Sequence, residues 1–186
     1  GIPPTMGYCF IPEIMERVST LQNEVPIEWK VSGSNNLGQL LRSGKIDIAI
    51  IPLGFIQMDN LECRKFRDVE EILFVAKDNP LANEKSVTAD MIANERFVLF
   101  TEEYNQNVPF EKLFNNGGFY PKRVTYTSQL STALNYVEKN IAVSVMIRDI
   151  WELSHHKSNF RAISFDPPYQ LKLVLAWRKQ PHLSWE

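Results

Sequence analysis

The sequence predicts an α/β protein made of two similar lobes. The clearest sign is a strand–helix–strand unit over residues 29–52, WKVSGSNNLGQLLRSGKIDIAIIP, and a unit of the same order returns over residues 124–147. The two units lie about half a chain apart, which favours two like lobes over one long sheet. A helix that joins two strands over so short a distance implies parallel strands with a right-handed crossover.

The two strands of the first unit differ in their hydrophobic pattern. Residues 29–31 alternate between apolar and polar side chains, as in a half-buried strand. Residues 46–51 are almost continuously apolar, which is typical of a strand covered on both faces. The first unit therefore predicts one edge strand and one buried strand.

The helix between these strands is amphipathic and has recognisable ends. Its apolar side chains recur with helical spacing at Leu37, Leu40 and Leu41. Ser34 or Asn35 can cap its start, and Gly44 can end it in a left-handed conformation. The second unit repeats these signals, because Ser128 precedes a helical stripe and Asn140 follows it.

The other elements follow from the same patterns. We expect a short strand running into a loop over residues 1–5, a helix over 12–23 that starts at Pro12, a strand over 27–31, and a loop over 53–68 that closes the first lobe. Further strands are expected at 71–76, 96–100, 124–127, 141–147, 160–165 and 171–177, with helices at 88–94, 109–116, 129–139 and 148–155. The pair Pro167–Pro168 is expected to form a rigid joint between the last two strands.

Composition and charge place the chain among ordinary globular proteins. Hydrophobic residues make up 44% and charged residues 23% of its 186 residues. The formal net charge is −2 and no cluster of Lys and Arg is visible, so the chain itself is not expected to bind nucleic acid. No stretch is apolar and long enough to span a membrane, and no signal peptide is recognisable, so no membrane contact is expected. The start at Gly1, without an initiator Met, suggests a fragment or a processed chain.

No recognisable motif for catalysis or metal binding is present. The sequence lacks the nucleophile-elbow, zinc-peptidase, Walker A and dinucleotide-binding patterns, so we expect neither an enzyme nor a bound cofactor. His155 and His156 are neighbours on a predicted helix and point to different sides, so a shared metal ion is not expected. Cys9 and Cys63 are too few for a disulfide framework, and we expect reduced, buried thiols in a cytoplasmic protein.

Small hydroxyl and amide residues recur where predicted strands turn into helices. The simplest interpretation of each is a helix cap, but in two facing parallel lobes these turns would border one crevice and offer N–H and O–H donors to an anion. The candidate ligand-binding residues, taken from these turns and their neighbours, are Thr5, Met6, Ser32, Ser34, Asn35, Thr101, Tyr104, Ser128 and Gln129.

The order of these segments resembles the effector-binding domain of LysR-type transcriptional regulators. The segments that carry the resemblance are GIPPT, VSGSNNLGQLLRSGKIDIAII, ILFVAKDNPLA, RFVLF, VEKNIAVSVMIRD and LKLVLAWRK, and they cover essentially the whole chain. The most specific parts are L-x-x-G-K-I-D-I-A-I and the N-P-L-A after an apolar strand. The chain departs from the family at Asn140, where a glycine is usual, and near Met146 and Ile147, where a proline is common.

The resemblance implies a two-lobed fold of the periplasmic-binding-protein type, with two crossing strands and a small effector between the lobes. It places lobe I at residues 1–73 plus 172–186 and lobe II at residues 74–171. It also implies that DNA is bound only through an N-terminal winged helix-turn-helix domain that this chain lacks. Homo-oligomers are implied as well, with a dimer here and a tetramer in the full-length protein.

A dimer is also expected from the residues themselves. The helix over 12–23 and the strand over 27–31 carry more apolar surface, at Met15 and Ile27 among others, than one core face needs. We expect this surface to contact the helix over 129–139 of a second copy, where Tyr136 lies away from the apolar stripe.

Three other readings remain open from the sequence. An extracytoplasmic solute-binding protein of a transporter would share the two-lobed plan. An enzyme with an active site in the crevice would need a nucleophile or an acid–base pair that is not visible. A thiol switch within the regulator family would need a cysteine motif, and both cysteines fall in the first lobe without one.

Overall fold

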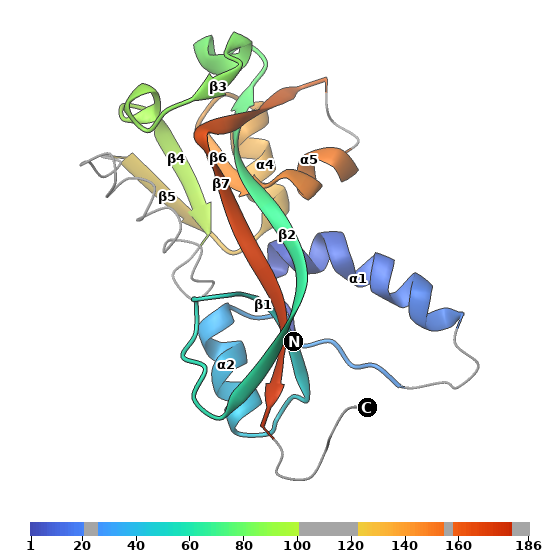
Figure 1. The fold of residues 1–186 in the computed structure, drawn as a ribbon. Helices are drawn as coiled ribbons and strands as arrows, with labels where there is room; N and C mark the ends of the chain where they lie inside the picture. The colour runs from blue at the N-terminus through green and yellow to red at the C-terminus, as the bar shows by residue number, and fades with distance from the viewer. Residues whose placement is uncertain (21–25, 101–122, 155–157, 180–186) are drawn as a thin grey trace.

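Two long antiparallel strands connect two lobes in the computed structural model, which describes residues 1–20, 26–100, 123–154 and 158–179 (Figure 1). The strands are β2 (Leu61–Ala76) and β7 (Phe160–Arg178), and their pairing runs from Leu61↔Arg178 to Ala76↔Phe160. The chain passes from lobe I to lobe II along β2 and returns along β7. The predicted pair of crossing strands is therefore present.

Lobe I is built from α2 (Ser34–Arg42) and β1 (Ile48–Pro52) around one end of β2 and β7. β1 pairs with β7 in antiparallel register from Ile48↔Trp177 to Pro52↔Leu173. On its other side β1 meets the start of the chain, because the Ile50 N–H donates to the Gly1 carbonyl at 2.9 Å. This lobe has its own buried cluster, formed by Leu37, Leu41, Ala49, Ile51, Leu61, Val174 and Ala176.

Lobe II surrounds the opposite end of β2 and β7. Its strands are β3 (Ser86–Val87), β4 (Arg96–Phe100), β5 (Arg123–Thr127) and β6 (Ser144–Ile147). Its helices are α4 (Leu130–Glu138) and α5 (Arg148–Leu153), with 3-10 turns η1 (Pro80–Asn83) and η2 (Asp90–Ile92). β4 and β5 are parallel, β6 pairs antiparallel with β2, and β3 pairs parallel with β7.

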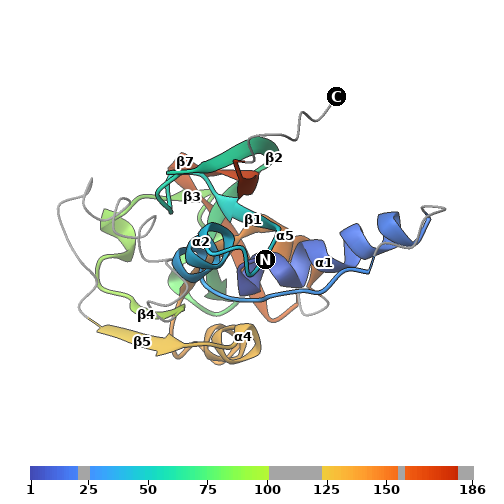
Figure 2. The ribbon, with the colours of Figure 1, turned by 90° about the horizontal axis from the view of Figure 1, so that it is seen from below.

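Helix α1 (Pro4–Ser19) starts in lobe I and extends away from the body of the molecule, with the segment that leads to α2 running alongside it (Figure 2). Its first turns are buried against lobe II. Met6 and Phe10 share one buried cluster with Met146 and Ile150. α1 therefore packs across the boundary between the lobes.

Three of the expectations for the N-terminal region are wrong. α1 begins at Pro4 rather than at Pro12, because Pro4 already suits the first turn of a helix, and Pro12 is tolerated inside it on an exposed side. No strand forms over residues 1–5 or 27–31. Only Ile2 and Val31 pair there, as an isolated parallel bridge.

Both crossing strands are also longer than expected. Residues 61–68 belong to β2 and not to a loop, because the β7 backbone pairs with them although side chains such as Glu62 and Lys65 are exposed. Residues 160–178 form one strand and not two. Pro167 and Pro168 lie where the register between β2 and β7 shifts. Glu71 pairs with Tyr169, whereas the next residue, Ile72, pairs with Ser164.

Other expectations are confirmed. Gly44 and Asn140 have φ values of 70° and 52°, so both end their helices in the left-handed conformation. The strands over 96–100 and 124–127 are present as β4 and β5. Within the described ranges, no helix has the length and apolar character needed to cross a membrane. The helix expected over 109–116, like His155 and His156, lies outside the described residues.

Candidate functional site

The first half of the candidate site lies where two neighbouring parallel segments of lobe I turn into helices. The Ile2 N–H donates to the Lys30 carbonyl at 3.0 Å, and the Ser32 N–H donates to the Ile2 carbonyl at 3.2 Å. The segment at Ile2 leads into α1 at Pro4, and the segment at Val31 leads into α2 at Ser34. Because the two segments run in the same direction, the starts of both helices lie at the same edge of lobe I.

These helix starts supply backbone donors. The first backbone hydrogen bonds of α1 and α2 run from the Gly7 N–H to the Pro3 carbonyl (2.7 Å) and from the Leu37 N–H to the Gly33 carbonyl (2.9 Å). The amides before them, including those of Met6 and Asn35, therefore have no partner within their own helix. Their partial positive charge favours an anion at this edge.

Ser34 is the candidate residue whose surroundings most favour a contact with a ligand. The residue is 1% exposed, and its hydroxyl makes no hydrogen bond with any residue that the structure describes. The expected capping role of Ser34 or Asn35 is wrong, because the N-cap of α2 is Gly33 and Ser34 is already one residue inside the helix. A buried hydroxyl without a partner costs about 1–3 kcal/mol, which a bound ligand would relieve.

The neighbouring candidates have different surroundings. Thr5 lies buried in the first turn of α1, at 1% exposure. Met6 belongs to the buried cluster between the lobes, so its side chain is part of the core. The Ser32 hydroxyl accepts a hydrogen bond from the Asn36 amide at 2.8 Å, which closes the turn before α2.

The second half of the candidate site has the same plan in lobe II. β4 and β5 are parallel neighbours, and their register ends at Phe100↔Thr127. Ser128 and Gln129 follow β5 directly and are both exposed. Ser128 is not the cap of α4, because the N-cap is Gln129 and its N–H donates to the Thr127 hydroxyl at 3.2 Å. Thr101 and Tyr104 lie outside the described residues.

The repeat predicted from the sequence is present in three dimensions. In lobe I the segment at Gly1–Ile2 lies between Val31 and β1, and in lobe II β4 lies between β5 and Val143. In each lobe the segment on one side, at Val31 or in β5, leads through a helix, α2 or α4, to the segment on the other side, at β1 or Val143. The starts of α2 and α4 therefore occupy corresponding places in the two lobes, with Ser34 just after the N-cap Gly33 and Ser128 just before the N-cap Gln129.

The crossing strands add two polar groups that the sequence reading missed. Glu71 on β2 lies opposite Ile147 of β6 on one side and Tyr169 of β7 on the other. It is 5% exposed, and among the described residues neither its carboxyl nor the Tyr169 hydroxyl makes a hydrogen bond. Burial raises the pKa of Glu71 to about 8, and burial together with Glu71 raises the pKa of Tyr169 to about 12. The sequence signal for a buried acidic residue here is that Glu71 stands directly before the apolar residues 72–76.

The adjacent Glu70 has a different environment. Arg148 donates to the Glu70 carboxylate at 2.8 Å and to the Ser164 hydroxyl at 2.6 Å. The hydrogen bond from Arg148 lowers the pKa of Glu70. The guanidinium of Arg148 is therefore engaged by Glu70 and does not pair with Glu71.

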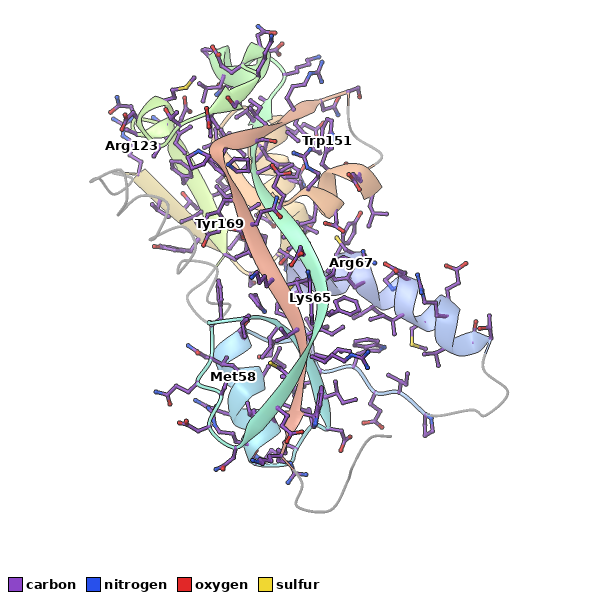
Figure 3. All side chains as sticks on the ribbon, in the orientation of Figure 1. Met58, Lys65, Arg67, Arg123, Trp151 and Tyr169 are labelled. Atoms are coloured by element: carbon purple, nitrogen blue, oxygen red, sulfur yellow. The ribbon has the colours of Figure 1, made fainter. Side chains whose placement is uncertain are left out.

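A third feature that the sequence reading missed is the cation between the lobes. Arg67 of β2 contacts Glu13 of α1 at 2.9 Å and Asp149 of α5 at 3.6 Å, and lies 5.0 Å from the centre of the Phe10 ring. Figure 3 shows Arg67 on the side of the crossing strands nearer α1 and Tyr169 on the side nearer β4. Arg67 thus ties α1 to lobe II away from the candidate ligand site.

Among the residues that the structure describes, the cysteines and the other titratable groups do not gather into one site. Cys9 and Cys63 are both free; Cys9 is buried as expected, whereas Cys63 is exposed because its side chain leaves the polar end of β2. Burial raises the pKa of the Cys9 thiol to about 12, so the thiolate is disfavoured. No group of three or more metal-ligating side chains gathers within the described ranges.

Comparisons with known proteins agree with this architecture. The family model for the LysR substrate binding domain matches residues 1–184. The HTH-type transcriptional regulator YybE of Bacillus subtilis is 28% identical over 188 residues, covering 99% of this chain and 62% of that protein. HcaR, the Hca operon transcriptional activator of Escherichia coli, is 22% identical over 183 residues, covering 96% of this chain and 60% of that protein. The chain thus spans about 60% of the length of these curated relatives.

Solved structures show the same fold. The effector binding domain of QuiR, solved in complex with shikimate, superposes with a TM-score of 0.82 at 20% identity, covering 100% of this chain and 88% of that chain. Full-length OxyR from Pseudomonas aeruginosa superposes with a TM-score of 0.85 at 19% identity, covering 97% of this chain and 62% of that chain. The curated relatives are named as transcriptional regulators, which disfavours a transporter component. The two-lobed fold is that of periplasmic binding proteins, and the chain belongs to the LysR substrate binding domain family, the effector-binding part of LysR-type transcriptional regulators.

Proposed function

We propose that this domain binds a small anionic metabolite between its lobes and thereby controls how a larger regulator binds DNA. The observation that carries the proposal is the pair of helix starts, α2 after the parallel bridge at Val31 and α4 after the parallel strand β5. Ser34 and Ser128 provide hydroxyls there, and the first-turn amides provide backbone donors. The shikimate bound by QuiR carries a carboxylate, which is the kind of group that these donors favour.

The other parts of the proposal follow from family membership. Lobe I comprises residues 1–73 plus 172–186 and lobe II residues 74–171, so that the ligand lies where β2 and β7 cross between them. DNA is bound by a separate winged helix-turn-helix domain of the same regulator, which works in the cytoplasm as a homo-oligomer and is not an enzyme. Ser32, Asn35, Thr101, Tyr104 and Gln129 complete the ligand site together with Thr5 and the backbone of Met6.

A charge placed at the lobe II edge tests the ligand site. Native mass spectrometry of the freshly purified domain, followed by a thermal-shift screen of small carboxylates, supplies the ligand. Ser128→Asp is expected to weaken its binding at least tenfold by calorimetry, because the new carboxylate repels the anion at the helix start. Ser128 is exposed, so the variant is expected to keep the unfolding temperature of the wild type within a few degrees.

Asn135→Asp is the matched control. It adds the same charge to an exposed position about 10 Å farther along α4, where no helix start is present. Equal affinity of the wild type and Ser128→Asp would show that the site lies elsewhere. A similar loss in both variants would show a general charge effect.

A further inference from the structure

The buried carboxyl of Glu71 lies at the edge of lobe II where the candidate ligand site begins. β6 pairs Ile147 with Glu71, and β6 itself adjoins β4 through the bridge between Phe97 and Val143. β4 in turn pairs Phe100 with Thr127 of β5. Counting along these registers, Glu71 and Tyr169 fall in the row just beyond Phe100 and Thr127, which is the row of Ser128.

In the proposed ligand site, this row would form one wall. Neighbouring strands are about 4.8 Å apart, so the three spacings from β5 to β2 separate Ser128 from Glu71 by about 14 Å at the backbone. The side chains and two hydrogen bonds of about 3 Å shorten the remaining gap to the length of a small metabolite. One molecule can therefore contact a helix start at one end and Glu71 at the other.

The surroundings of Glu71 determine which chemical group of a ligand it would bind. The charged and titratable groups next to it are Tyr169 across β7 and the Glu70–Arg148 pair, and Arg148 is engaged by Glu70 and Ser164. Ile147, opposite on β6, is apolar. A second anionic group of a ligand could not stabilise the carboxylate form of Glu71, whereas a protonated amine would supply both the charge and the donors that this carboxylate lacks.

We propose that Glu71 and Tyr169 form a second subsite of the ligand site, which takes the protonated amine of an amino-acid-like effector. The proposal rests on the proposed function, because the helix starts of α1, α2 and α4 bind the anionic end of the same molecule. The effector is then a zwitterion and not a simple carboxylate or a dicarboxylate.

Binding of such a ligand releases a proton. Burial raises the pKa of Glu71 to about 8, so the unliganded domain holds the carboxyl in its neutral form at pH 7. The ligand's ammonium group favours the carboxylate, and the proton of the carboxyl passes to the buffer while the ligand keeps its own. Simple carboxylates have no amine and leave Glu71 protonated.

The test compares the twenty protein amino acids with their deaminated carboxylic acids by thermal shift, and measures the best binder by calorimetry in phosphate and Tris buffers. At least one amino acid is expected to bind at least tenfold more tightly than its deaminated partner, with a release of up to one proton at pH 7. Glu71→Gln is expected to remove both the amine preference and the proton release while it retains binding of the deaminated acid. Tyr169→Phe is expected to reduce the amine preference and provides a second variant if Glu71→Gln does not fold.

Glu62→Gln, the same change at an exposed position of β2, is the control and should leave both measurements unchanged. An amine preference that survives in Glu71→Gln overturns the subsite, and so does a screen in which no amino acid binds. If carboxylates bind, Ser128→Asp loses them and the amine has no effect, then the ligand site stands and only the amine subsite fails.

Discussion

At the scale of single residues, Glu70 and Glu71 show how two adjacent carboxyls acquire opposite behaviour. They alternate on the same strand, so one meets the Arg148 guanidinium and the other is buried beside Tyr169. The pKa of Glu70 is lowered by its hydrogen bond from Arg148, and the pKa of Glu71 is raised by burial to about 8. The two residues should therefore affect the pH dependence of stability in opposite directions.

Replacing Glu71 should make the domain less sensitive to alkaline pH. Between its ordinary pKa of 4.5 and about 8, Glu71 is protonated in the folded state and ionised in the unfolded state, so its contribution to stability falls as the pH rises. Glu71→Gln is expected to gain stability relative to the wild type from pH 5 to pH 8, by up to about 1.4 kcal/mol per pH unit. Urea unfolding at pH 5, 6.5 and 8 measures this difference.

Glu70→Gln should change the pH dependence of stability in the opposite direction. The lowered pKa of Glu70 means that its ion pair stabilises the fold above the ordinary pKa and loses this effect as the pH falls through the lowered value. Glu70→Gln should therefore be destabilised near neutral pH and approach the stability of the wild type in acid.

A Glu71→Gln variant whose difference in unfolding free energy from the wild type stays constant from pH 5 to 8 would contradict the buried neutral carboxyl.

At the scale of secondary-structure elements, α1 and the segment beside it form an apolar surface. Exposed apolar side chains on this surface are Met15 at 38%, Ile27 at 37% and Val31 at 48%. Tyr136 on α4 is half-buried and packs against the main cluster, so it is less suited to a charged substitution than the α1 surface is. The dimer predicted from the sequence would bury the α1 surface of each copy against α4 of the other.

Disrupting this surface should separate the dimer. Ile27→Glu is expected to raise the dimer dissociation constant at least tenfold, because two copies of the charge would be buried around the two-fold axis. Ile48→Glu is a matched control, since Ile48 on β1 is 48% exposed and lies outside the proposed interface. Sedimentation equilibrium measures both variants. A wild type that is monomeric at tens of micromolar would exclude this dimer, and an intact Ile27→Glu dimer would place the interface elsewhere.

Local patterns in the sequence predict some of the elements and give no sign of others. The repeated unit and the ends at Gly44 and Asn140 could be predicted, because local spacing and backbone conformation determine them. The polar half of β2 could not, because its residues pair with a strand about 110 positions away and local periodicity carries no sign of that partner. Glu71 was missed for the same reason, since its burial comes from β6 and β7. Both serine caps were misassigned by one residue because cap position depends on where the preceding strand ends.

At the scale of the whole molecule, charge argues against DNA binding by this domain. Most non-specific DNA affinity comes from counterion release when Lys and Arg neutralise phosphates. The formal net charge of this domain is −2, so this contribution should be small. The isolated domain is expected to leave a DNA duplex unshifted in a gel at 50 mM salt, where such binding is strongest. A shift that weakens as salt is raised would contradict this prediction and indicate a local basic surface.

The crossing of β2 and β7 also sets an order of events during synthesis. β1 and most residues of the lobe I cluster lie early in the chain, but the strand that covers β1 and contributes Val174 and Ala176 to this cluster is the last described strand. A ribosome that makes the protein from its N-terminus must therefore finish lobe II before lobe I can close. Until then, Leu37, Leu41 and Ile51 lack part of their cover, and the edge of β1 is unpaired. Nascent chains stalled with residues 1–170 outside the ribosome should thus be recognised by chaperones at the first lobe and not at the second.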